Sequence, residues 1–435
     1  ISPKLCPFSP ASFGRMLLRW RHNFHAPRQR ERNRRAVMTQ SNGAPTSGEL
    51  RSFVETVAVF LLRISVVVVK WPMAHVHNNE TFLRSLYQRT NSSRNGYIAR
   101  AGRSPIAIAD HGDYSAGSIS LQDARDRVVA DFEQQCETQR RLQDDAVPFA
   151  RLITGTQLMA HAFGAAVEQF PGQMPFARPI ASNAEEAAAI EQPELESCEP
   201  LMRVIELGEM VEARLGPRTP LGPPDMQTGF DTACLLWEKS DMFVSLYDEQ
   251  GIQAADQLAA RCAGLLLEFI SALRSRFPQM SPCHCPSVWC PPELGPWVSN
   301  DEAGSIGREH YDRFCYPELE ALAARFGSVA THCCADAEHQ FERFRQTPGW
   351  YAFNRVAGLK GYASLLDAFP SVESDARVSD GNPLFVMGWV SDEDQRMLED
   401  HFGRNGSMIF HRDFETTDDA RRWLEASRDQ GQTEV

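Results

Sequence analysis

The feature that most constrains the fold is an alternation of strand-like and helix-like segments from about residue 116 to the end of the chain. Short apolar runs, such as residues 328–333 and 407–414, alternate with longer stretches whose apolar residues recur at helical spacing, such as residues 253–277. Repeated βα units imply a parallel sheet, open or closed. No glycine-rich phosphate-binding motif follows any of these strands, which disfavours a nucleotide-binding doubly wound fold. We therefore predict an α/β protein built as a single (β/α)8 TIM-type barrel with an N-terminal helical extension.

The first 72 residues differ from the rest. Residues 1–40 carry nine Lys and Arg residues against one acid, and the apolar run at 57–69 is interrupted by Arg63. That run is too short to cross a hydrocarbon core of about 30 Å, although a signal or an amphipathic anchor is an alternative. We predict that residues 1–72 are a disordered or non-native leader, that residues 73–115 form an N-terminal arm and that residues 116–435 form the barrel.

Charge and cysteine content limit the partners and the compartment. The net charge is −13, and because the first forty residues are basic, the body of the chain is more acidic still. An acidic body disfavours a nucleic-acid partner, since phosphate binding needs a cationic surface. The eleven cysteines are odd in number and mostly scattered, which favours reduced thiols. We expect a cytoplasmic enzyme with a small-molecule substrate and no membrane, and a homodimer is one expected assembly.

Polar residues at the ends of the expected strands define the candidate site, because the strand ends of a barrel ring one mouth. These residues are Asp225, Gln227, His284, Asp301, His332, Cys334 and His411. Of them, Asp225, Asp301 and His284 are the predicted catalytic residues, in which the two aspartates would act as general acids or would anchor a substrate amine. A loop or helix cap is the alternative role for each aspartate.

The segment His332-x-Cys334 suggests a metal. Positions i and i+2 of an extended segment point to the same side, so both side chains could reach one ion. Zn²⁺ favours imidazole and thiolate, and it would activate a bound thiol. A third ligand is needed, and His411 is the first choice, followed by His284 or Cys285. The alternative is that His332 is only hydrogen-bonded and Cys334 only packed.

Four segments, taken in order, resemble the uroporphyrinogen decarboxylase superfamily, which includes cobamide-dependent methyltransferases. They lie at residues 147–168, 220–238, 298–327 and 331–349. The resemblance implies a (β/α)8 barrel with a wide cleft at its C-terminal mouth. It also implies that Arg100 and Arg103, in a segment similar to the arginine motif of the family, bind substrate or cofactor carboxylates, and Gln227 is assigned to the same cofactor-binding role.

The two branches of the superfamily differ in chemistry. The decarboxylase branch uses an aspartate at the position of Gly155 and a tyrosine near the position of Cys234. The methyltransferase branch uses an HxC pair and a later cysteine as ligands. His332 and Cys334 match the HxC pair, but no cysteine follows Cys334, and His411 is the nearest substitute for the last ligand. The glycine that usually follows HxC is Ala335 in this chain.

The most favoured function is therefore zinc-dependent methyl transfer between a corrinoid, or a methylated substrate, and a thiol. A corrinoid protein would be a partner. One alternative is a cofactor-independent uroporphyrinogen decarboxylase, or a related tetrapyrrole enzyme, with a rearranged site. Another is a barrel that binds a corrinoid or a tetrapyrrole without catalysis.

Overall fold

The computed structural model describes residues 73–90, 93–102, 119–170, 173–356, 361–371 and 382–429. The described strands are β1 (Gly96–Ala101), β2 (Ala150–Arg151), β3 (Val167–Glu168), β4 (Phe176–Ala177), β5 (Leu221–Gly222), β6 (Trp297–Ser299), β7 (Val329–Cys333), β8 (Trp350–Arg355), β9 (Leu384–Gly388) and β10 (Met408–Phe414). The prediction for residues 1–72 and the parts of the predicted arm at 91–92 and 103–115 lie outside the described residues.

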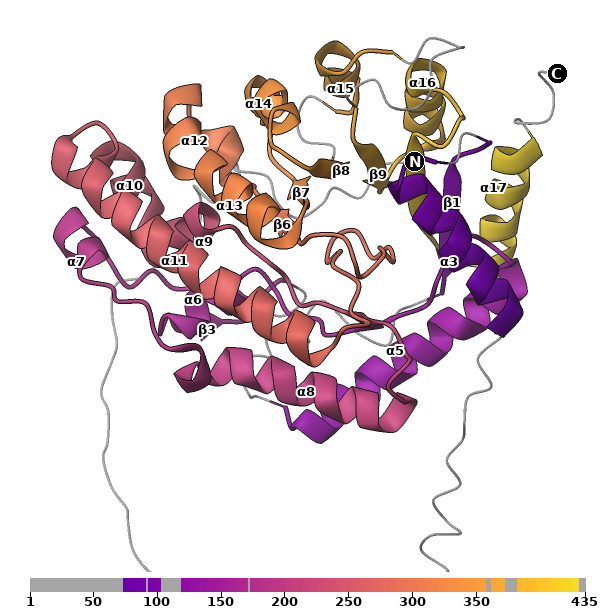
Figure 1. Ribbon diagram of the computed structural model, residues 1–435, viewed down its shortest axis with the longest axis horizontal. Coiled ribbons are helices and arrows are strands. Elements are labelled where there is room, and N and C mark those ends of the chain that lie inside the picture. The colour runs from indigo at the N-terminus through magenta and orange to yellow at the C-terminus, as the bar shows by residue number, and fades with distance from the viewer. Residues whose placement is uncertain are drawn as a thin grey trace, which may run out of the picture. The chain divides into compact units, whose positions relative to one another are not determined.

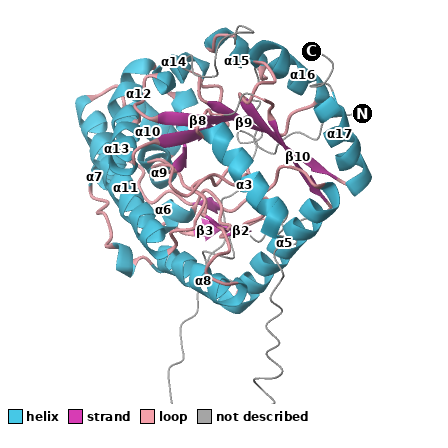
Figure 2. Cartoon of the chain, turned by 45° about the vertical axis from the view of Figure 1, so that its right-hand side comes forward, coloured by secondary structure: helices cyan, strands magenta, loops and turns pink. Residues whose placement is uncertain are grey.

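Helices surround these strands (Figures 1 and 2). The α-helices are α3 (Met73–Tyr87), α5 (Leu121–Leu142), α6 (Leu158–Ala162), α7 (Ala184–Ala188), α8 (Glu199–Leu215), α9 (Gly229–Leu236), α10 (Lys239–Ser245), α11 (Glu249–Arg276), α12 (Arg308–Phe314), α13 (Tyr316–Phe326), α14 (Phe341–Arg345), α15 (Ala363–Ala368), α16 (Asp392–Phe402) and α17 (Thr417–Asp429). The short 3₁₀ helices among the described residues are η1 (Leu195–Ser197), η2 (Glu302–Ser305) and η3 (Glu338–Gln340).

The central sheet has six strands in the order β1-β10-β9-β8-β7-β6, and every neighbouring pair is parallel. A second parallel pair joins β2 to β5, and a single bridge between Gln227 and Ser299 links the segment after β5 to β6. The α/β class with a central parallel sheet is thus confirmed. Among the described residues no ladder joins β1 to β2, so the closure of the sheet into a barrel is not shown.

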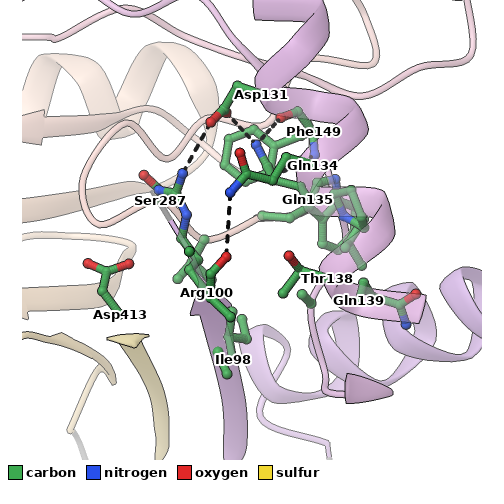
Figure 3. A pocket seen from close by; sticks show the side chains of 18 residues that line it. Ile98, Arg100, Asp131, Gln134, Gln135, Thr138, Gln139, Phe149, Ser287 and Asp413 are labelled. Carbon is green, nitrogen blue, oxygen red and sulfur yellow. Dashed lines mark hydrogen bonds and ion pairs between the residues drawn. The ribbon is translucent and has the colours of Figure 1, made fainter. Parts of the chain in front are cut away.

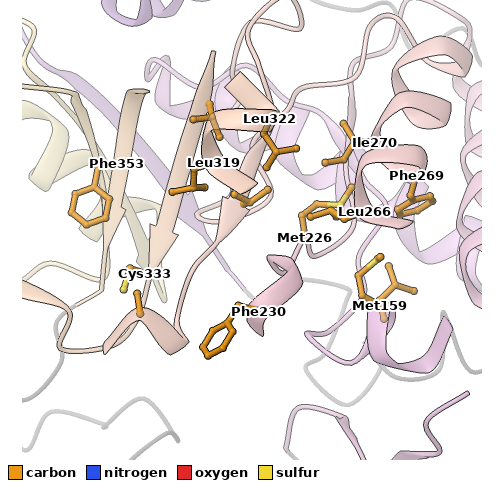
Figure 4. Packing of buried hydrophobic residues seen from close by; sticks show 14 of the residues in the cluster. Met159, Met226, Phe230, Leu266, Phe269, Ile270, Leu319, Leu322, Cys333 and Phe353 are labelled. Atoms are coloured by element: carbon orange, nitrogen blue, oxygen red, sulfur yellow. The ribbon is translucent and has the colours of Figure 1, made fainter. Parts of the chain in front are cut away.

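The two faces of the sheet carry separate hydrophobic clusters, because successive residues of a strand point to opposite faces. On one face, side chains such as Phe353 and Cys333 pack against the surrounding helices (Figure 4). On the other face, alternate strand residues such as Ala330 and Ala352 pack with helix α3 and the segment 283–290. Since both faces are covered, β7 is buried along its whole length, and only its carboxyl end can present polar groups to a ligand.

Two segments with short apolar runs, residues 174–181 and 283–289, add no strand to the central sheet. Residues 174–181 contain β4, which pairs antiparallel with β3 in a small hairpin and does not join the central sheet. Residues 283–289 form no strand, and this connection between α11 and β6 lies across the second face of the sheet. Its proline-rich sequence explains the difference, since a proline cannot donate to a sheet ladder. Within the described ranges, no helix has the length and apolar character that a membrane span requires.

Candidate metal centre

Three side chains with metal-binding atoms meet at the carboxyl ends of β6 and β7. They are Asp301, just after β6, His332 near the end of β7, and Cys334, the first residue beyond β7. One ligand atom from each lies within 4.8 Å of the other two, and within the described part of the chain they are the only such group of three or more. His332 is buried, Asp301 is partly buried and Cys334 is exposed, so the group is open to solvent on the Cys334 side.

Asn354 of β8 fixes the orientation of His332. The two residues are register partners, and Nδ1 of His332 lies 2.5 Å from Oδ1 of Asn354. The amide nitrogen of Asn354 donates to the carbonyl of Val386 at 2.5 Å, so its oxygen must face the imidazole and Nδ1 must be the donor. In the neutral imidazole the lone pair is then on Nε2. That nitrogen faces Oδ1 of Asp301 at 4.0 Å.

Backbone hydrogen bonds hold Asp301 in place. Its Oδ1 accepts a hydrogen bond from the Cys334 amide at 2.7 Å, which ties the turn after β6 to the turn after β7. The buried carboxylate of Asp231, in the first turn of α9, accepts the amides of Asp301 at 2.6 Å and Glu302 at 3.0 Å. The position of the Asp301 carboxylate is therefore fixed by contacts among three chain segments: the turn after β6, the turn after β7 and the first turn of α9.

The electrostatic environment of His332 is anionic. Burial alone would lower the pKa of the imidazole, but the charge and hydrogen bond of Cys285, the charge of Asp301 and the hydrogen bond to Asn354 raise it to about 10. The acceptors and negative charges that stabilise a proton on the His332 imidazole would also stabilise a metal ion bound in place of that proton. Sites that hold metals commonly show this preference, because the ligands are anionic and the metal competes with protons.

His284 and Asp225 lie beside this group. The His284 ring is 6.1 Å from the His332 ring, its Nδ1 is 3.9 Å from Oδ2 of Asp225 and its Nε2 is 3.4 Å from Oγ of Ser299. Burial raises the pKa of Asp225 to about 6, although the hydrogen bond from Gln227 and the charge of His332 lower it. Burial, and then the charges of His332 and Arg151, lower the pKa of His284. The structure therefore places two further predicted site residues, His284 and Asp225, beside the metal-binding group.

Gln227 and Arg100 are engaged with other protein groups. The amide of Gln227 donates to Oδ1 of Asp225 at 2.6 Å, so its predicted cofactor-binding role remains a prediction. Arg100 contacts Asp131 of α5 at 3.3 Å, and both line a cavity of about 270 Å³ between β1 and α5 (Figure 3). Arg103 lies outside the described residues.

His411 lies apart from the three grouped ligands. It is on β10, and β9 and β8 separate that strand from β7. Its side chain is buried among other charged groups: burial lowers its pKa to about 4, the charge of Asp413 opposes this, and the charges of Arg100 and Arg151 add to the lowering. Asp301 stands as the third member of the group, where the sequence alone suggested His411.

The donor set fits zinc. An imidazole nitrogen, a thiolate sulfur and a carboxylate oxygen are the three donor types that Zn²⁺ takes in proteins, and a set of three with an open position is typical of catalytic sites. The Asn354 hydrogen bond to the second imidazole nitrogen is the supporting contact that metal-bound histidines generally have. Hard cations such as Mg²⁺ are disfavoured, because they prefer oxygen ligands and avoid thiolates.

Asn354 and Asp231 are the residues that sequence reasoning missed. Asn354 is a polar residue at the carboxyl end of an apolar strand, which is the same signal that identified His332. Asp231 carries no such signal, since it occurs in the first turn of a helix, where acidic residues are common for electrostatic reasons.

Comparison with known proteins gives little further information. No family model matches the sequence, and no curated protein matches it. Among solved structures, a methyltransferase from Methanosarcina mazei is similar over 81% of this chain and 98% of its own length, with 11% sequence identity and a TM-score of 0.49. A likeness at this level says nothing about activity or substrate.

Proposed function

We propose that this protein is a zinc-dependent methyltransferase of the uroporphyrinogen decarboxylase superfamily that transfers a methyl group to a thiol. The observation that carries the proposal is the grouping of Asp301, His332 and Cys334 within 4.8 Å of one another at the strand ends. The resemblance of four segments to the superfamily supports methyl transfer over other uses of a zinc site. It also makes a corrinoid, free or held by a partner protein, the proposed methyl donor.

The proposed fold is a closed (β/α)8 barrel. The eight parallel strands would be β1, β2, β5, β6, β7, β8, β9 and β10. The strand order β2-β5-β6-β7-β8-β9-β10-β1 follows from three sets of pairings. They are the ladder between β2 and β5, the bridge from Gln227 to Ser299 and the ladders of the six-stranded sheet. On the other side, helix α5 packs against both β1 and β2, which supports their being neighbours. In such a barrel the metal centre would lie at the C-terminal mouth.

Zinc bound here would lower the pKa of a substrate thiol so that it is a thiolate at neutral pH. His332, Cys334 and Asp301 would hold the ion, and Asn354 would keep Nε2 of His332 directed at it. The thiol would enter where Cys334 opens the site to solvent, and its proton would leave to water there. The sulfur then forms a bond to the methyl carbon, while the bond from that carbon to the donor breaks and its electron pair stays with the donor.

An assay with methylcobalamin and a panel of low-molecular-weight thiols tests this function. We expect loss of the methylcobalamin absorbance and a methylated thiol detected by mass spectrometry, in equal amounts. Cys334→Ser should lower the rate at least tenfold. Cys333→Ala is the matched control, because this neighbouring side chain is fully buried in the hydrophobic cluster, and it should retain activity.

The decarboxylase alternative is tested with the same protein. Release of carbon dioxide from uroporphyrinogen by metal-free protein, with no methyl transfer to any thiol, would overturn the proposal. Binding of a corrinoid without turnover of any thiol would overturn it in favour of a non-catalytic role.

A further inference from the structure

The cavity between β1 and helix α5 lies where no ladder joins β1 to β2 among the described strands (Figure 3). Its volume of about 270 Å³ is close to the lower limit of small-ligand sites in proteins, which is about 300 Å³. Asp301, His332 and Cys334 do not line it. The cavity is therefore separate from the candidate metal centre.

Side chains make the hydrogen bonds that a strand ladder would otherwise make along this cavity. On the β1 edge, the backbone amide of Ala99 donates to the carboxylate of Asp144 at 2.8 Å. On the facing edge, the backbone amide of Phe149, the residue before β2, donates to the side chain of Gln135 at 3.3 Å, and its carbonyl accepts from that side chain at 3.1 Å. Because buried backbone groups must be paired, these contacts stabilise the two edges without a ladder. The cavity is thus part of the native fold.

The charged side chains that line the cavity are one cation, Arg100, and two carboxylates, Asp131 and Asp413. Arg100 is 3.3 Å from Oδ1 of Asp131, which is buried, so these two charges offset each other. Asp413 is exposed near the end of β10, and no other group in the described ranges forms an ion pair with it. The cavity therefore presents a carboxylate to a ligand and favours a cation over an anion.

A buried amide lines another part of the cavity without a protein partner. Gln139 is 2% exposed, and within the described part of the chain its Nε2 has no hydrogen-bond partner. Buried polar groups are rarely left unpaired, so a ligand oxygen that accepts from Nε2 accounts for this amide. In Figure 3, Arg100 and Thr138 lie between Asp413 and Gln139. The carboxylate and the amide donor are therefore at opposite ends of the cavity.

Aromatic rings complete the walls. Phe149 and Trp289 both line the cavity and are both buried. Aromatic rings attract organic cations, and they provide an apolar surface for methylene groups. The lining thus combines a carboxylate at one end, an amide donor at the other and apolar rings. This combination is complementary to a short organic chain with an ammonium group at one end and an oxygen at the other.

We propose that this cavity binds a small organic ammonium ion that also carries a hydrogen-bond acceptor, in the simplest case an amino alcohol. The ammonium group faces Asp413, and the hydroxyl oxygen accepts a hydrogen bond from Nε2 of Gln139. Binding requires no metal, so the site goes beyond the proposed methyl transfer and does not depend on it. The carboxylate-binding role that the family resemblance implies for Arg100 predicts the opposite preference, for an anion.

Titration calorimetry of the full-length protein, with a metal chelator present, tests the proposal. The probes are unbranched amino alcohols from ethanolamine to aminohexanol, and hydroxycarboxylates of the same lengths are the matched anions. We expect the amino alcohols to bind, with the highest affinity at one chain length, and the hydroxycarboxylates to bind about tenfold more weakly or not at all. Asp413→Asn should weaken the binding of the best amino alcohol about tenfold or more, because it removes the charged acceptor. Gln139→Leu, which has a similar volume but no donor, should weaken it several-fold.

Asp418→Asn is the matched control, because Asp418 is exposed on α17, pairs with Arg421 and does not line the cavity. It should leave the affinity unchanged. Tighter binding of the hydroxycarboxylates would overturn the proposal and would favour Arg100 as the group that selects the ligand. Binding of neither class, or equal affinity in wild type and Asp413→Asn, would also overturn it. Since Asp413 is exposed, its variant decides the result even if Gln139→Leu does not fold.

Discussion

The imidazole of His332 and the side-chain amide of Asn354 meet across neighbouring strands, with Nδ1 2.5 Å from Oδ1. This contact leaves only Nε2 of His332 for a metal, and the bond from Asn354 to Val386 prevents the amide from turning over. We predict that Asn354→Ala weakens zinc binding by about 10–100-fold, the usual effect of removing a group that supports a metal-bound histidine. Competition with a chromophoric zinc chelator measures the affinity.

Asn79→Ala is the matched control for this variant. Asn79 is also buried, and its amide donates to the backbone carbonyls of Asp144 and Ala146, which are not among the residues of the metal centre. It should lower the free energy of unfolding without changing the zinc affinity. Equal zinc affinity in Asn354→Ala and wild type would show that the Asn354 contact has no part in metal binding.

Arg355 holds the chain beyond Cys334. Its guanidinium is completely buried at the end of β8, 3.0 Å from Asp336 and 2.8 Å from Glu338. Arg355→Met fills a similar volume but leaves two carboxylates without their cation, so we predict a loss of about 3 kcal/mol in the free energy of unfolding. Urea unfolding measures it.

The exposed pair Arg313–Asp256 provides the comparison for Arg355. Because solvent screens exposed ion pairs, Arg313→Met should change the free energy of unfolding by less than about 1 kcal/mol. An Arg355→Met protein as stable as Arg313→Met would mean that the buried cation does not stabilise this turn.

Glu318 gives stability a pH dependence. Burial raises the pKa of this carboxyl from 4.5 to about 8. The carboxylate accepts a hydrogen bond from the Gly229 amide, and this bond alone would lower the pKa. The native state therefore binds more protons than the unfolded state between these pH values, so the free energy of unfolding falls as pH rises from about 4.5 to about 8. At roughly 1.4 kcal/mol for each pKa unit, the fall is on the order of a few kcal/mol.

Glu318→Gln isolates this contribution, because glutamine keeps an acceptor for Gly229 and cannot ionise. Chemical denaturation at pH 5 and pH 9 should show a smaller loss of stability for Glu318→Gln than for the wild type. Glu320→Gln, on the exposed side of the same helix, should behave as the wild type. If Glu318→Gln loses as much stability between pH 5 and pH 9 as the wild type does, other carboxyls are responsible for the pH dependence.

The periodicity of the sequence was sufficient to predict the α/β class and the strands at residues 328–333 (β7) and 407–414 (β10), because each is a short buried apolar run next to an amphipathic helix. It could not distinguish β4, whose short length and flanking Pro175 and Pro179 suit a hairpin outside the sheet. Closure into the predicted (β/α)8 barrel stays a prediction, because it needs hydrogen bonds between β1 and β2, and the described residues contain no ladder between these two strands.

The candidate site was only partly predictable for the same reason. Alternation along a strand was enough to place His332 and Cys334 on one side. The third member depends on the register of β6 against β7, in which Ser299 is the partner of His332, and this register brings Asp301 beside Cys334. Sequence spacing carries no information about that pairing, so Asp301 was assigned a catalytic role and His411 a ligand role.

Metal analysis of the purified full-length protein after exposure to Zn²⁺ tests the central claim most directly. With Asp301, His332 and Cys334 as ligands, we predict one zinc ion per chain in the wild type and none in His332→Ala after dialysis, with the circular dichroism of the two proteins unchanged. Wild-type protein that retains no zinc, or a His332→Ala variant that retains as much as the wild type, would contradict it.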